Sequence, residues 1–154
     1  MQHLGVKRGD TLIEVVISLA ILASVITIAT TGSLNAWRAS RLAGERTKAT
    51  GLAQRQADAL KAYKKSMSWA GFQSVLPLST TGFFMKYDDP GLGWKLQSGP
   101  DLSEQPFNQI IKYDCTTSVS CNFTITVKWQ SSVRPNAGDA SDEVSLFVRL
   151  GDLN

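Results

Sequence analysis

The sequence has few of the residues that carry most enzyme and metal chemistry. Its 154 residues include one histidine, His3, and two cysteines, Cys115 and Cys121. Zinc sites built from thiolates usually need four ligands, so this set argues against a bound metal. Serine-hydrolase and phosphate-loop motifs are absent. The adjacent acids Asp88 and Asp89 lie in a Pro/Gly-rich stretch, where such side chains are usually solvated. We therefore expect no enzyme activity, no catalytic residue and no cofactor.

Charged residues are missing from one long segment. Residues 15–37, from Val15 to Trp37, are 23 uncharged residues rich in Val, Ile, Leu and Ala, with no proline. As a helix rising about 1.5 Å per residue they would reach about 35 Å, more than the roughly 30 Å of a bilayer's hydrocarbon core. The segment predicts a single membrane-spanning helix.

Beyond the span, charge separates two regions. Residues 33–65 hold eight basic and two acidic side chains, whereas residues 66–154 hold six basic and nine acidic ones. Alanines and apolar residues continue at helical spacing to about Lys65, so we expect one helix over residues 10–65. Its narrow apolar stripe beyond Ala49 is the expected cover for a sheet.

Residues 66–154 predict a β-rich head domain. Residues 66–106 are rich in Gly and Pro and are expected to form a connecting region. Strands are predicted over 108–114, 122–129 and 143–150, the last two from alternating apolar and polar residues. Because no further helices alternate with these strands, we expect an α+β fold, a long helix packed on three or four antiparallel strands.

The two cysteines stand six residues apart, a spacing that lets the two strands of one hairpin bring them together. An even number of cysteines in an exported segment favours a disulfide over two free thiols. We expect a disulfide between Cys115 and Cys121, and with it an oxidising compartment.

The residues that precede the apolar segment have an unusual order. The basic pair Lys7-Arg8 and Gly9 lead into Asp10-Thr11-Leu12-Ile13-Glu14. A signal peptide normally passes directly from its positive end into its apolar segment. A carboxylate at the edge of a membrane span costs free energy and needs a partner. Cleavage after Gly9 would supply one, an α-ammonium on Asp10 four residues before Glu14, and such a pair would set the register of helices packed side by side.

This junction, Gly-Asp-Thr-Leu-Ile-Glu-Val before a long apolar helix, resembles the prepilin leader junction of type IV pilins and type II secretion pseudopilins, whose usual form is Gly-Phe-Thr-Leu-Ile-Glu. The motif covers residues 7–30, and the likeness beyond them is one of architecture. The resemblance implies a leader of residues 1–9, cleavage between Gly9 and Asp10 by a prepilin peptidase, N-methylation of Asp10, and Glu14 as the assembly carboxylate. Asp10 stands where the usual form has Phe, and it adds a second negative charge beside Glu14.

The leading hypothesis is therefore a structural subunit, a minor pilin or pseudopilin. It would wait in the cytoplasmic (inner) membrane with its head outside the cytoplasm and then join a cell-surface or periplasmic filament. The partners implied are other pilin subunits through the apolar helix, the prepilin peptidase, the assembly platform and the membrane. The alternative is a single-pass anchored binding or adhesion module that never polymerises. The sequence does not distinguish motility, DNA uptake, adhesion and secretion.

Three further patterns also have ordinary explanations. Arg8-Gly9-Asp10 spells a cell-adhesion tripeptide, but the expected cleavage divides it. Asn122-Phe123-Thr124 fits a glycosylation acceptor and equally fits strand alternation. The basic residues between 38 and 65 have the composition of a nucleic-acid-binding helix, although a solvated or subunit-facing helix is the favoured explanation.

One pattern opposes the expected topology. Four basic residues follow the span closely and two precede it, which by the positive-inside rule alone would leave the C-terminal part in the cytoplasm. The leader junction and the cysteine pair point outward, and we give them the greater weight.

Overall fold

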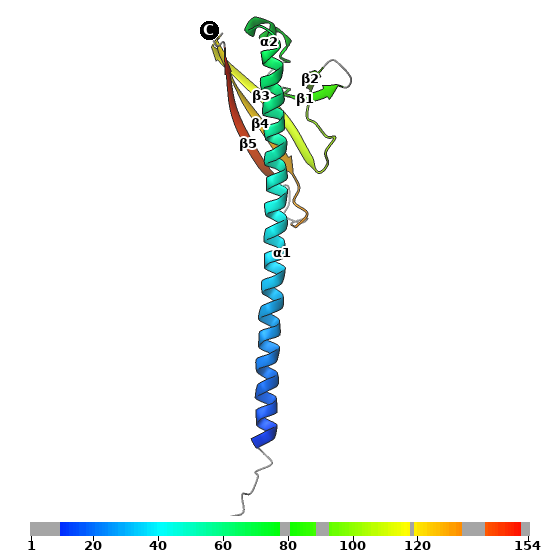
Figure 1. The fold of residues 1–154 in the computed structure, drawn as a ribbon, viewed down its shortest axis with the longest axis vertical. Helices are drawn as coiled ribbons and strands as arrows, with labels where there is room; N and C mark the ends of the chain where they lie inside the picture. Colours follow the sequence, from blue (N-terminus) through cyan, green and yellow to red (C-terminus); the bar gives the residue numbers. More distant parts are fainter. Residues whose placement is uncertain (1–9, 78–80, 89–92, 118, 134–140, 152–154) are drawn as a thin grey trace, which may run out of the picture. The chain divides into compact units, whose positions relative to one another are not determined.

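The structure, a computed structural model, describes residues 10–77, 81–88, 93–117, 119–133 and 141–151, with the backbone alone at 10, 11, 116 and 117. Helix α1 spans Asp10–Lys65 and helix α2 spans Trp69–Val75. The strands are β1 (Phe83–Asp88), β2 (Gly93–Ser98), β3 (Phe107–Thr117), β4 (Ser120–Trp129) and β5 (Asp142–Gly151). They form one antiparallel sheet in the order β2-β1-β3-β4-β5 (Figure 1). The predicted α+β fold, a long helix packed on an antiparallel sheet, is confirmed.

The chain divides into two compact units after Arg41. The first unit contains the apolar part of α1. The second unit begins at Leu42 and contains the remainder of α1, α2 and the whole sheet. The second half of α1 is therefore a structural part of the head.

Within the second unit, small side chains let α1 pack closely on the sheet. Ala49, Ala53 and Ala57 recur every four residues and are at most 1% exposed, and Leu60 on the same face is fully buried. Residues four apart form a ridge on a helix surface, and alanines in that ridge allow a close approach. The predicted role of the stripe beyond Ala49 as the sheet's cover is confirmed (Figure 1).

The sheet contributes the other side of this core. Every second residue of β4 from Cys121 to Trp129 is buried, in the alternation predicted for this strand. The ring of Phe123 lies 6.0 Å from that of Phe72 on α2 and 5.8 Å from that of Tyr113 on β3. Each large apolar side chain buried in this way contributes about 1.5–3 kcal/mol relative to an exposed one. The core thus joins α1, α2 and the central strands.

Residues 66–106 are more regular than expected, and the prediction of a plain connecting region is wrong for α2, β1 and β2. Ser68 caps α2, because its hydroxyl accepts a hydrogen bond from the N–H of Gly71 at 3.2 Å. Strands β1 and β2 pair along their whole length, from Phe83↔Ser98 to Asp88↔Gly93. The sheet therefore has five strands, not three or four. The glycines and prolines of this region separate short elements without preventing them.

Candidate functional site

The apolar part of α1 is exposed all around its circumference. Its large apolar side chains are 54–72% exposed in the chain. These are Leu12, Ile13, Val15, Val16, Ile17, Leu19, Ile21, Leu22, Val25, Ile26, Ile28, Leu34 and Trp37. An 18-residue window of this helix has a mean hydropathy of 2.6 and is 0% buried, so by length and composition the helix can cross a membrane. A helix that is apolar on every side is stable in lipid or among similar helices, and not in water.

The hydroxyl groups of Ser24, Thr27, Thr30 and Thr31 in this segment donate hydrogen bonds to the helix's own backbone. Ser24 donates to the carbonyl of Ala20 at 2.8 Å, and Thr27 donates to that of Ala23 at 2.8 Å. Thr31 makes the same bond to the carbonyl of Thr27 at 2.9 Å. Lipid offers no hydrogen-bonding partner, so polar side chains in a span must be satisfied from within. The hydroxyls that interrupt the apolar run are therefore compatible with a membrane or with a dry helical bundle.

The predicted processing site lies at the very start of α1. Asp10 is the first residue of the helix, and Glu14 lies one turn farther along on the same side. Gly9 and the expected leader, residues 1–9, lie outside the described residues, as does the side chain of Asp10. Within the described part of the chain, Glu14 forms no ion pair. Its pairing with an α-ammonium at Asp10 stays a prediction.

Cys115 and Cys121 close the end of the β3–β4 hairpin. They are joined as a disulfide, with their Cα atoms 4.1 Å apart. Both cysteines come one step beyond the paired positions Asp114↔Asn122, so they face each other across the hairpin. Cys121 is 1% exposed in the core, whereas Cys115 is exposed. The hairpin geometry fits the predicted disulfide.

Part of the basic charge on α1 is engaged with the head. The guanidinium of Arg55 lies 3.3 Å from a carboxylate oxygen of Glu104. The ammonium of Lys48 lies 5.1 Å from the centre of the Phe107 ring, within the range of a cation–π contact. Nucleic-acid binding relies on basic groups that are free to neutralise phosphates. These contacts give the charges a structural role within the head.

Glu45 ties α1 to the end of β4. Its carboxylate accepts hydrogen bonds from the indole N–H of Trp129 at 3.3 Å and from the backbone N–H of Ser132 at 3.2 Å, and also from the Ser132 hydroxyl. Burial raises the pKa of Glu45, but hydrogen bonds from Ser132, Ser131 and Trp129 together outweigh that effect and hold the pKa below its usual value of 4.5. The partners stand 84 and 87 positions away, so no local pattern in the sequence indicates this contact.

Comparisons with protein-family models, with curated proteins and with solved structures found no match to this chain.

Proposed function

We propose that the chain is a structural subunit of a type IV pilus-like or type II secretion-like filament, a minor pilin or pseudopilin that assembles through the apolar part of α1. The observation that carries this proposal is a helix apolar on all sides that continues directly into the core of a β-sheet head. Among the described residues, α1 contributes buried side chains to the head's core from Ala49 onward, and Glu45 and Lys48 add contacts just before it. The apolar residues 15–37 are left free to contact lipid first and neighbouring helices later.

The start of α1 supports the same function. The carboxylate of Glu14 directly precedes the apolar segment and forms no ion pair among the described residues. In a bundle of like helices, an amino terminus freed at Asp10 would neutralise this charge on the same chain or on a neighbour. Breaking such a buried pair would cost about 3–5 kcal/mol, so the pair would select one axial position. In this proposal the prepilin peptidase, the assembly platform and other pilin subunits are the partners.

The intact mass and N-terminal sequence of the protein, recovered from its native membrane and from sheared surface material, test the proposal. We expect a chain that begins at Asp10, with or without a methyl group. Replacing Gly9 with Leu is expected to leave an uncut precursor, whereas the control Gly5→Leu, within the leader and away from the junction, is expected to be cut normally. A mature chain that begins at Met1 would favour the permanently anchored binding module. A chain that begins after residue 37 would identify an ordinary secreted protein.

A further inference from the structure

The sheet of the head is split between β1 and β3. These two strands are paired only at Phe83↔Ile111. If the antiparallel register continued, Met85, two residues after Phe83, would lie opposite Gln109, two residues before Ile111. The strands separate there instead.

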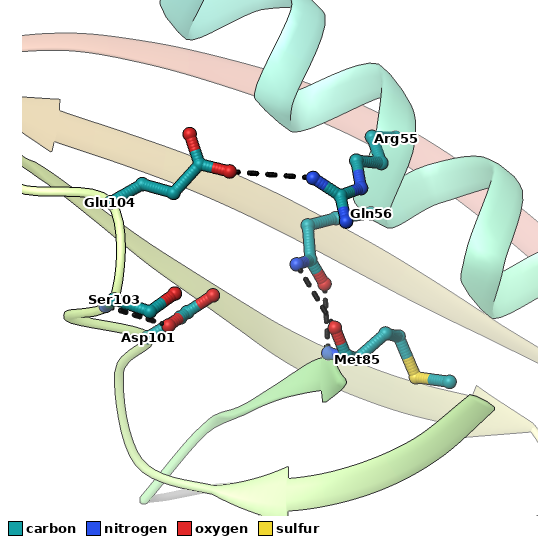
Figure 2. Close-up of polar contacts among 6 residues, drawn as sticks. All are labelled: Arg55, Gln56, Met85, Asp101, Ser103 and Glu104. Atoms are coloured by element: carbon teal, nitrogen blue, oxygen red, sulfur yellow. Dashed lines mark hydrogen bonds and ion pairs between the residues drawn. The ribbon is translucent and has the colours of Figure 1, made fainter. Parts of the chain in front are cut away.

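Each side of the split is closed by a different group. The N–H of Met85 donates to the side-chain oxygen of Gln56 at 2.8 Å, and the amide nitrogen of Gln56 donates to the carbonyl of Met85 at 3.2 Å (Figure 2). On the other side, Gln109 exchanges two backbone hydrogen bonds with Asp101, at 2.7 and 3.1 Å. The backbone groups that a continuous ladder would use are therefore satisfied. At the split, neither Met85 nor Gln109 has a free backbone group with which an added strand could pair.

A cavity of about 140 Å³ lies in this split. Gln109 lines it from the core-facing side of β3 and is 3% exposed. The side-chain amide of Gln109 forms no hydrogen bond with another described residue. In the described chain every fully buried side-chain nitrogen or oxygen has a partner, so the amide atoms of Gln109 are not fully buried. They keep some accessible surface, and the cavity is a space that Gln109 lines. A buried amide needs a hydrogen-bonding partner, and here a molecule in the cavity can supply one.

The charges around the cavity balance. Arg55 and Lys86 line it together with Asp101 and Glu104. Arg55 is already paired with Glu104 at 3.3 Å, as Figure 2 shows. A charged ligand would have to break this pair or leave an excess of one sign. A neutral ligand with several hydroxyls can bond to the carboxylates, the guanidinium and the Gln109 amide without disturbing it.

The mouth of the cavity is aromatic. Tyr87 of β1 and Trp94 of β2 line it, and their rings lie 5.3 Å apart in an edge-to-face arrangement. Tyr87 is 55% exposed, which is a large fraction for an aromatic side chain in a paired strand. Aromatic rings beside hydrogen-bonding side chains suit a ligand that has both C–H and hydroxyl faces.

We propose that this cleft, bounded by Gln56, Gln109, Arg55, Asp101 and Trp94, binds one residue of a neutral sugar, free or at the end of a glycan. The cavity is smaller than the roughly 300–1,000 Å³ of sites for drug-sized ligands, so at most a single ring would enter it. The residues that line the cleft all belong to the head, so sugar binding there would not depend on filament assembly.

The test uses the full-length chain in a detergent with a phosphocholine headgroup, because glycoside detergents would compete for the cleft. Saturation-transfer NMR is recorded with glucose, galactose, mannose, N-acetylglucosamine and N-acetylgalactosamine, and with glycine as a zwitterionic probe. At least one sugar is expected to bind with a dissociation constant of about 1 mM, typical of a ligand with so few atoms. Absence of transfer to every sugar, or transfer to glycine alone, overturns the proposal.

Two pairs of variants locate the binding. Gln109→Leu is expected to weaken binding at least about tenfold because the amide is lost, while the thermal unfolding midpoint is kept or raised because an apolar side chain replaces a buried polar one. Its control is Asn108→Leu, on the opposite, exposed face of β3, which is expected to bind normally. Trp94→Ala is expected to lose binding and Trp94→Phe to keep most of it. Unchanged binding in both Gln109→Leu and Trp94→Ala would show that the sugar sits elsewhere.

Discussion

Gln56 of α1 forms the two hydrogen bonds with the backbone of Met85 that a neighbouring strand would otherwise form. Its replacement by Met keeps the volume but leaves the N–H and the carbonyl of Met85 without partners. Each unpaired group costs about 1–3 kcal/mol, so we expect Gln56→Met to lower the free energy of unfolding by about 2–6 kcal/mol. Urea unfolding of the full chain in detergent measures the difference. Gln54→Met, on the exposed side of the same helix turn, is the control and is expected to change stability by no more than about 0.5 kcal/mol.

Glu45 makes the head sensitive to acid. Because its pKa is lower in the folded chain than its usual value of 4.5, its ionised form stabilises the fold above that pH. That stabilisation is lost as the pH falls through the lower, folded pKa. We expect Glu45→Gln to cost about 1 kcal/mol at neutral pH, with the difference from wild type shrinking below pH 4.5 and lost once the pH is below the lower, folded pKa. Denaturant midpoints across this range measure it. The control Asp114→Asn removes an exposed carboxylate that forms no ion pair among the described residues, and an equal acid response in that variant would contradict the assignment to Glu45.

The β3–β4 hairpin is held by both its ladder and its disulfide. The pairing runs from Phe107↔Trp129 to Asp114↔Asn122, so the strands are expected to stay paired without the bridge. Cross-linking so short a loop contributes about 2 kcal/mol in the chain-entropy description. We expect the double variant Cys115→Ala/Cys121→Ala to lose about that much stability, read from urea unfolding, while its circular dichroism spectrum is unchanged. Wild type treated with a reductant should behave in the same way, and loss of the β signal in either would contradict this expectation.

The elements that could be predicted from the sequence are those with sustained periodicity. The apolar pattern of helix α1 and of strands β4 and β5 is sustained over about ten residues or more. The sequence predicts each of these elements within a few residues of its bounds. Strand β1 has only six residues, and its first three are all buried, so it lacks the alternation of a half-exposed strand. Contacts of Gln56 and Glu45 join residues 29 and 84 positions apart. Such contacts follow from tertiary packing, which no local pattern contains.

At the scale of the whole molecule, Glu14 is expected to matter only after the chain leaves the membrane. Glu14→Ala should be processed at Gly9 like wild type, because the change spares the junction. Its incorporation into filaments is expected to fall at least about tenfold, because a lost buried ion pair costs about 3–5 kcal/mol. Quantitative immunoblots of membrane and sheared fractions measure both steps. The control Asp58→Ala removes an exposed carboxylate from the head's part of α1, and undiminished incorporation of Glu14→Ala would remove Glu14 from the assembly mechanism.

Two features of the chain favour opposite orientations in the membrane. Basic residues beyond the span favour a cytoplasmic head, whereas a disulfide persists only in an oxidising compartment. With the head outside, intact cells treated with a membrane-impermeant maleimide should show labelling of the exposed Cys115 only after an impermeant reductant has opened the disulfide. With the head inside, both cysteines would already be reduced, and the exposed Cys115 would react only after lysis, with no reductant needed. The variant Cys115→Ala/Cys121→Ala should remain unlabelled throughout. We expect the first pattern, because the disulfide between Cys115 and Cys121 would not persist in the reducing environment of the cytoplasm.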